Sequence, residues 1–83
     1  MKLPRDLSGE QLARLLAHTY GYRPRRSRGS HQTVTLTTKT AEHSVTIPLH
    51  RPVRIGTLRH IVSDVAAFLG LPAADVRQEL FGE

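Results

Sequence analysis

Two neighbouring stretches of the chain, residues 31–38 and 43–49, alternate apolar and polar side chains, and this pattern constrains the fold most. Alternation with a period of two is typical of a β-strand that buries one face. The apolar positions are Val34, Leu36, Val45, Ile47 and Leu49. Because only a short polar loop separates the two stretches, we expect an antiparallel hairpin with one buried face and one polar face.

The segments that flank this hairpin carry apolar residues at helical spacing instead. Ser8 and Gln11 form a capping-box pattern at the start of the first helix, and Thr57 is the expected N-cap of the second. A glycine marks the end of each helix, and a short third helix is expected over residues 73–80. The buried stripes are predicted to include Leu12, Leu15 and Leu16, then Leu58, Ile61, Val62, Val65, Ala66 and Leu69.

A further short strand is predicted over residues 22–28, before a two-residue turn at Gly29 and Ser30. Glycine at the first central position suits a type II′ hairpin turn. Pro24 has no N–H to donate to a neighbouring strand, so this strand should lie at an edge of the sheet.

The apolar faces also predict how the second and third strands pair. With a four-residue loop between them, Leu36 lies opposite Val45, and the same register brings His31 opposite His50. A shift of two residues would keep the same faces and leave His31 diagonal to His50. A cross-strand distance separates the two alternatives.

These elements predict an α+β fold for a single domain spanning residues 1–83. Their order is helix, three antiparallel strands, helix and a short C-terminal helix. Both main helices must share one core on the same face of the sheet, because each strand offers only one apolar face. The other face of the sheet is polar and is expected to meet solvent or a ligand.

Positive charge is concentrated in the middle of the chain. Residues 23–59 contain eight arginines and lysines but only one acid, Glu42, whereas the flanks hold four basic residues and six acids. Such asymmetry is typical of proteins that bind nucleic acids. The chain has no cysteine, which excludes disulfides and thiolate metal sites. The N-terminal residues lack the apolar core of a signal peptide, so we expect a cytoplasmic protein with no membrane contact.

Four blocks of sequence resemble a known family of small toxins. They are Leu12-x-x-Leu15-Leu16 with Tyr20-Gly21-Tyr22, then Arg28-Gly29-Ser30-His31, then Val45-Thr46-Ile47-Pro48-x-His50, then Ile55-Gly56-Thr57-Leu58-x-x-Ile61. In this order, across residues 3–81, the chain resembles the HicA toxins, mRNA interferases of bacterial and archaeal toxin–antitoxin pairs. The chain departs from the family at Pro24 and Arg25, where members usually have apolar or mixed residues.

The resemblance implies a fold like that of double-stranded-RNA-binding domains and ribosome-independent cleavage of mRNA. It also implies that no metal or other cofactor is required and that a cognate HicB-type antitoxin neutralises the toxin. In the family, the histidine of the Gly-Ser-His block is catalytic, and this position is His31 here.

Metal-free RNA cleavage needs a proton acceptor, a proton donor and positive charge near the phosphate. Histidine suits proton transfer because its ordinary pKa is about 6.5, and we expect His31 to be the general acid or base. The expected RNA contacts are Arg26, Arg28, Ser30, Thr33, His50 and Arg51. His43 and His60 are interpreted as surface residues, and no metal site is expected. The alternative is a non-catalytic module that binds double-stranded RNA or another nucleic acid, such as an operator.

Overall fold

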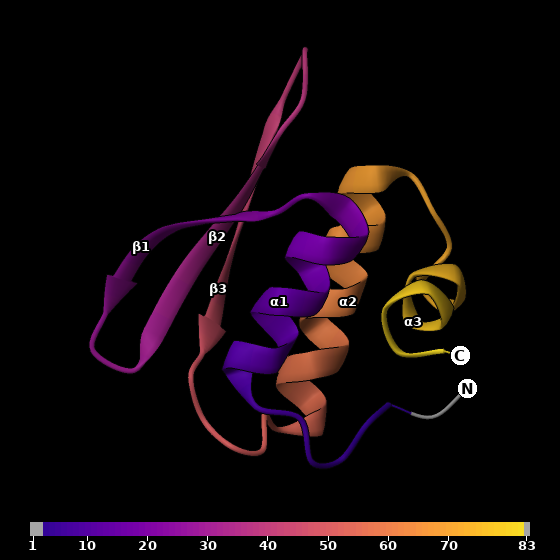
Figure 1. Cartoon of the computed structure of the whole chain (residues 1–83). Coiled ribbons are helices and arrows are strands. Elements are labelled where there is room, and N and C mark those ends of the chain that lie inside the picture. Colours follow the sequence, from indigo (N-terminus) through magenta and orange to yellow (C-terminus); the bar gives the residue numbers. More distant parts are fainter. Residues whose placement is uncertain (1–2, 83) are drawn as a thin grey trace.

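The computed structural model describes residues 3–82 and has the predicted order of helices and strands (Figure 1). The elements are α1 (Gly9–Tyr20), β1 (Arg23–Arg28), β2 (His31–Thr37), β3 (Glu42–Pro48), α2 (Ile55–Leu69) and α3 (Ala73–Phe81). The three strands form an open antiparallel sheet in the order β1-β2-β3. The predicted α+β class and the position of β1 at an edge of the sheet are therefore confirmed.

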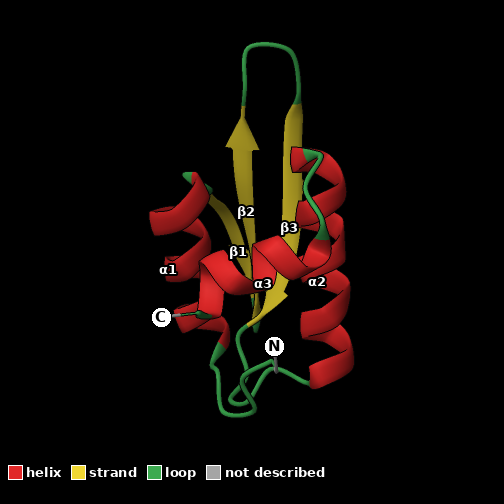
Figure 2. Cartoon of the chain, turned by 90° about the vertical axis from the view of Figure 1, so that its right-hand side faces the viewer, coloured by secondary structure: helices red, strands yellow, loops and turns green. Residues whose placement is uncertain are grey.

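The elements stack in three layers. Figures 1 and 2 show that α1 and α2 lie side by side on one face of the sheet and that α3 crosses them on the side away from it. The apolar stripes of the two long helices meet the apolar face of the sheet, with Leu12, Leu16, Ile47 and Leu58 fully buried. One face of the sheet is left without a covering layer.

The start and end of α1 follow the predicted capping chemistry. The Gln11 backbone N–H donates to the Ser8 hydroxyl at 3.0 Å, and the Ser8 N–H donates to the Gln11 side chain at 2.8 Å. Gly21 ends the helix in the left-handed conformation, with φ 87°.

The predicted start of α2 is wrong by three residues. The helix begins at Ile55 with Arg54 as its N-cap, so Thr57 lies inside the first turn. The Val53 N–H donates to the Leu7 carbonyl at 2.7 Å, and the Leu58 N–H donates to the Arg54 carbonyl at 2.8 Å. This anchoring of buried Val53 starts the helix early, although Arg54 provides no side-chain cap.

The predicted pairing of β2 with β3 is also wrong, by two residues. Val34 pairs with Val45, and His31 pairs with Pro48 instead of His50. The cause is a tighter turn, because Thr38 donates its N–H to the Ala41 carbonyl at 2.8 Å and its hydroxyl accepts from the Ala41 N–H at 3.1 Å. Only two residues then remain in the loop, and the apolar faces stay matched.

A β-bulge interrupts β1. Pro24 pairs with Val34 but Arg26 pairs with Thr33, so Arg25 is the additional residue. In the turn that follows, Gly29 has φ 58°, and no non-glycine residue among 3–82 has a positive φ. A positive φ at Gly29 but not at Ser30 agrees with the predicted type II′ turn.

Candidate nucleic-acid interface

The face of the sheet away from the helices is lined by hydroxyl groups that pair across the strands. The Thr35 and Ser44 hydroxyls lie 2.9 Å apart, and those of Thr33 and Thr46 lie 3.4 Å apart. Thr35 is only 6% exposed, because it occupies the central strand with paired neighbours on both sides. We call this surface the open face.

His31 is the first residue of β2 and follows the Gly29–Ser30 turn directly. It pairs with Arg28 on β1 and with Pro48 on β3. Because directly paired residues project from the same side of a sheet, Arg28, His31 and Pro48 all belong to the open face. His31 is exposed there.

A hollow of about 280 Å³ lies on one side of His31, and we call it the arginine hollow. It is lined by Arg26, Arg28, His31, Thr33 and Thr46. Three of the predicted RNA contacts therefore meet the predicted catalytic histidine in one place. The pairing of Arg26 with Thr33, beside the bulge, gives this strand two arginines on the open face next to His31.

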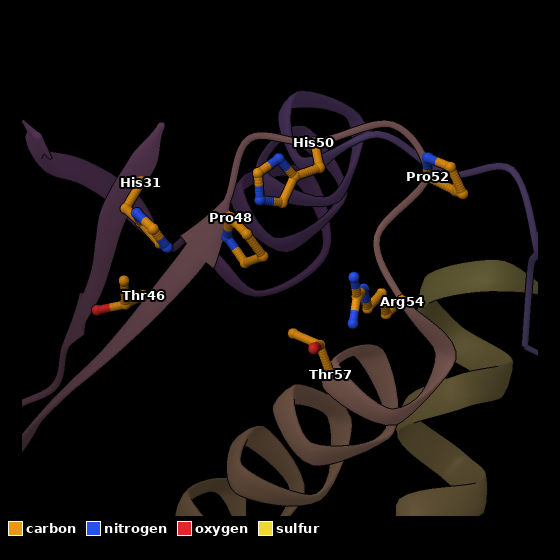
Figure 3. A pocket seen from close by; sticks show the side chains of 7 residues that line it. All are labelled: His31, Thr46, Pro48, His50, Pro52, Arg54 and Thr57. Carbon is orange, nitrogen blue, oxygen red and sulfur yellow. The ribbon is translucent and has the colours of Figure 1, made fainter. Parts of the chain in front are cut away.

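A larger hollow of about 610 Å³ lies on the other side, between the end of β3 and the start of α2 (Figure 3). We call it the proline hollow. It is lined by His31, Thr46, Pro48, His50, Pro52, Arg54 and Thr57. His31 and Thr46 belong to both hollows and form the wall between them.

His50 approaches His31 despite the shift in register. The two ring centroids lie 6.4 Å apart and the rings are inclined by 76°. The backbone around His50 is well anchored, because its carbonyl accepts from the Gly9 N–H at 2.9 Å and the Leu49 N–H donates to the Ser30 carbonyl at 2.6 Å. The loop after β3 therefore holds a second imidazole beside the first.

Two predicted RNA contacts lie outside both hollows. Ser30 forms the hairpin turn, where its backbone carbonyl is the group engaged. Arg51 donates through two nitrogens to the Asp6 carboxylate, at 3.2 and 3.0 Å. This hydrogen-bonded pairing lowers the pKa of Asp6 below its ordinary value.

Arg54 is the basic site residue that the sequence reasoning did not single out. It lies in the basic connector between β3 and α2, and its charge was the only signal that pointed to it. Only the fold brings its side chain into the proline hollow, opposite His31.

The arginines near His31 keep their charge uncompensated. Among residues 3–82, the acids form ion pairs with Arg25, His43 and Arg51, and none with Arg26, Arg28 or Arg54. Glu42, the one acid of the central segment, lies 3.1 Å from Arg25. Arginines without an acidic partner among the described residues therefore lie in both hollows that His31 lines.

The interpretation of His43 as a surface residue is wrong. Its side chain is only 15% exposed, with Nδ1 2.7 Å from the Tyr22 hydroxyl and Nε2 3.3 Å from Asp64. The ring stacks on Phe68, with centroids 4.8 Å apart. His43 pairs with Leu36 on the helix side of the sheet, and Tyr22 and Phe68, from distant segments, cover its ring there.

No group of three or more histidine or acidic side chains is placed to hold a metal ion within residues 3–82. Over the same residues, no helix has the length and apolar character needed to cross a membrane.

Comparison with protein families identifies a toxin family. A family model described as the HicA toxin of bacterial toxin–antitoxin systems matches residues 9–66, from the start of α1 to the last turn of α2. Searches of curated proteins and of solved structures found no significant match. The match includes His31 and every residue that lines the two hollows, and it covers well over half of the chain. The chain belongs to the HicA family of toxins from toxin–antitoxin systems.

Proposed function

We propose that this protein is an endoribonuclease toxin that cleaves mRNA without a metal and uses His31 as general acid or base. One observation carries the proposal: an exposed histidine forms the wall between two hollows that hold uncompensated arginines. Membership of a toxin family supports the same conclusion. The substrate places the activity in the cytoplasm.

The chemistry requires the 2′-oxygen of a ribose to attack the adjacent phosphorus while the bond from phosphorus to the 5′-oxygen breaks. A base removes the 2′-hydroxyl proton, and an acid protonates the leaving 5′-oxygen. His31 is suited to one of these transfers, since an imidazole changes charge near neutral pH. The products are a 2′,3′-cyclic phosphate and a 5′-hydroxyl.

The phosphate gains negative charge as the 2′-oxygen attacks. Arg26 and Arg28 line the same hollow as His31 and can stabilise this charge through paired N–H donors. Thr33 and His50 are proposed to contact the RNA from the two hollows, with Ser30 and Arg51 at their margins.

The proposed protein partner is a HicB-type antitoxin, as the family implies. The open face carries a row of hydroxyls and free arginines with no layer over it, and it suits an acidic surface. An antitoxin bound there would cover His31 and exclude RNA.

The test compares His31→Ala with wild type and with His60→Ala, a matched change at an exposed histidine of α2. We expect His31→Ala to lower the cleavage rate by about 10²- to 10⁴-fold and to leave RNA affinity nearly unchanged. His60→Ala should cleave like wild type. Mapping RNA ends after induced expression, together with growth arrest, provides the measurement.

Two results would contradict the proposal. If wild type cuts no RNA but binds duplex RNA through the same arginines, the protein is a binding module. If His31→Ala cuts at the wild-type rate, another residue carries the proton.

A further inference from the structure

We infer that the proline hollow is a binding subsite for one nucleotide of the RNA strand, the one that adjoins the phosphate at His31. Arg54 and His50 are the positioning residues that select and hold this nucleotide. The inference rests on the proposed function, because it assigns the substrate groups on one side of the cut.

The size and lining of the proline hollow suit a nucleotide. Its volume of about 610 Å³ lies within the range of about 300–1,000 Å³ that is typical of small-molecule sites. Pro48 and Pro52 supply apolar surface and Thr57 supplies a hydroxyl, whereas the Thr46 hydroxyl is directed toward Thr33. A nucleotide has the same mixture, with a flat base, a ribose that forms hydrogen bonds and an anionic phosphate.

The planar groups at the hollow are those on which bases stack. Single-stranded bases are held on histidine and aromatic rings and on the planes of arginine guanidinium groups. Figure 3 shows the His50 ring above Pro48, and the Arg54 guanidinium directed from the start of α2 toward the end of β3. Both side chains are exposed, and neither forms an ion pair within the described residues.

The position of the hollow relative to His31 fixes its role. Arg26 and Arg28 lie on one side of His31, whereas Arg54 and His50 lie on the other. A phosphate at His31 can therefore reach the guanidinium groups of the arginine hollow while the adjoining nucleotide enters the proline hollow. The proline hollow thus binds one side of the cut, and it should influence which sequences are cleaved.

The test uses Arg54→Ala and His50→Ala, with Arg59→Ala as the matched control. Arg59 is an exposed arginine of α2 that lines neither hollow and has no acidic partner among residues 3–82. Binding is measured with a 2′-fluoro RNA hexamer of mixed sequence, which lacks the attacking hydroxyl and stays intact. Cleavage-site preference is measured by sequencing the ends of a random RNA pool.

We expect Arg54→Ala and His50→Ala each to weaken hexamer binding about tenfold, as loss of one stacked base does. His50→Phe, which keeps a ring, should restore most of that affinity. Nucleotide preference should relax at one position next to the cut and stay unchanged elsewhere. Arg59→Ala should bind within about twofold of wild type and keep the wild-type preference.

Equal losses of hexamer affinity for Arg54→Ala and Arg59→Ala would overturn the inference. Arg54 would then contribute only a nonspecific electrostatic attraction for RNA. Binding of a nucleoside monophosphate as tight as that of the hexamer would also overturn it, by assigning the hollow to a free nucleotide. Failure of the proposed function looks different: wild type would cut no RNA while Arg54-dependent hexamer binding persisted.

Discussion

At the scale of single residues, Gly9 positions the site most directly. It starts α1, its N–H donates to the His50 carbonyl at 2.9 Å, and the helix meets the end of β3 at this point. A Cβ on Gly9 would lie 2.1 Å from the Pro48 carbonyl oxygen and 2.8 Å from the Leu49 Cα. Because both contacts are with backbone atoms, no side-chain rotation can relieve them. The close approach holds the wall of the proline hollow in place.

Gly9→Ala should therefore lower the free energy of unfolding by about 1–3 kcal/mol, the usual range for overpacking. Urea denaturation measures this change. The control is Gly56→Ala, where no atom lies within 4 Å of the added Cβ apart from its chain neighbours and the backbone of its own helix. In the helix, that change should stabilise the protein by about 0.5–1 kcal/mol. If the two variants have the same free energy of unfolding, α1 can move to accommodate the added methyl group without loss of stability, and the prediction is wrong.

At the scale of elements, the His43 side chain joins the start of β3 to the residue before β1 and to the C-terminal half of α2. Tyr22, Asp64 and Phe68 all contact the His43 ring, and Tyr22 is only 1% exposed. Burial, and to a lesser extent the nearby Asp64 carboxylate, raise the pKa of Tyr22 to about 12. The His43 ring, hydrogen-bonded to a neutral Tyr22, therefore links these three segments.

The raised pKa predicts lower stability at high pH. The unfolded chain loses the Tyr22 proton near pH 10, but the folded chain keeps it until about pH 12. The free energy of unfolding should therefore fall as the pH rises from 10 to 12, and Tyr22 should have no such effect below pH 10.

Tyr22→Phe provides the comparison for this prediction. Near pH 8 the free energy of unfolding of the variant should be about 1 kcal/mol lower than that of wild type, because the hydrogen bond to His43 is lost. Between pH 10 and 12 this free energy should fall less in the variant than in wild type. Burial and a hydrogen bond to Glu79 also raise the pKa of Tyr20. These two causes act in both proteins and cancel in the difference, and only the smaller contribution of Tyr22 itself is lost in the variant. Parallel stability curves over this pH range would contradict the assignment.

At the scale of the whole molecule, the helices and the unpaired arginines lie on opposite faces of the sheet. The helices lie on one side of the sheet (Figure 2). Arg26 and Arg28, which form no ion pair among residues 3–82, line a hollow on the other side. A third hollow, of about 370 Å³, continues along the open face beside Thr35 and Thr37, with Arg23 and Arg25 at its edge. The sheet thus presents a basic track along β2.

The salt dependence of RNA binding should distinguish free from paired arginines. Each phosphate contact on single-stranded RNA changes the slope of log K against log salt by about 0.7. Arg26→Ala should reduce the slope by about this amount, because Arg26 has no acidic partner among residues 3–82. Its neighbour Arg25, paired with Glu42, is the control and should change the slope little. If the two variants have equal slopes of log K against log salt, both arginines contact RNA phosphate to the same extent, and the prediction is wrong.

The pattern of residues predicted the elements well, because each signal is local. The Ser8–Gln11 capping box and the edge position of Pro24 follow from a few neighbouring residues and their hydrogen bonds. The site was predicted in part for the same reason: Arg28 and His31 flank one turn and must lie close together.

The sequence did not single out Arg54 as a site residue, and the interpretation of His43 as a surface residue was wrong. In both cases the surrounding residues come from distant segments. Arg54 reaches the site only when α2 packs beside the end of β3, and His43 is buried by Tyr22 and Phe68. The residues next to Arg54 and His43 in the sequence do not indicate either of these contacts.

The sequence by itself determined the order of elements, the apolar faces and the placement of His31 on a polar, basic face, since periodicity and turn chemistry act over a few residues. Only the tertiary structure decided the register of β2 and β3, because two registers bury the same side chains and the hydrogen bonds of Thr38 select between them. The same holds for the proline hollow, whose walls come from β2, β3 and α2 and exist only when those elements pack together.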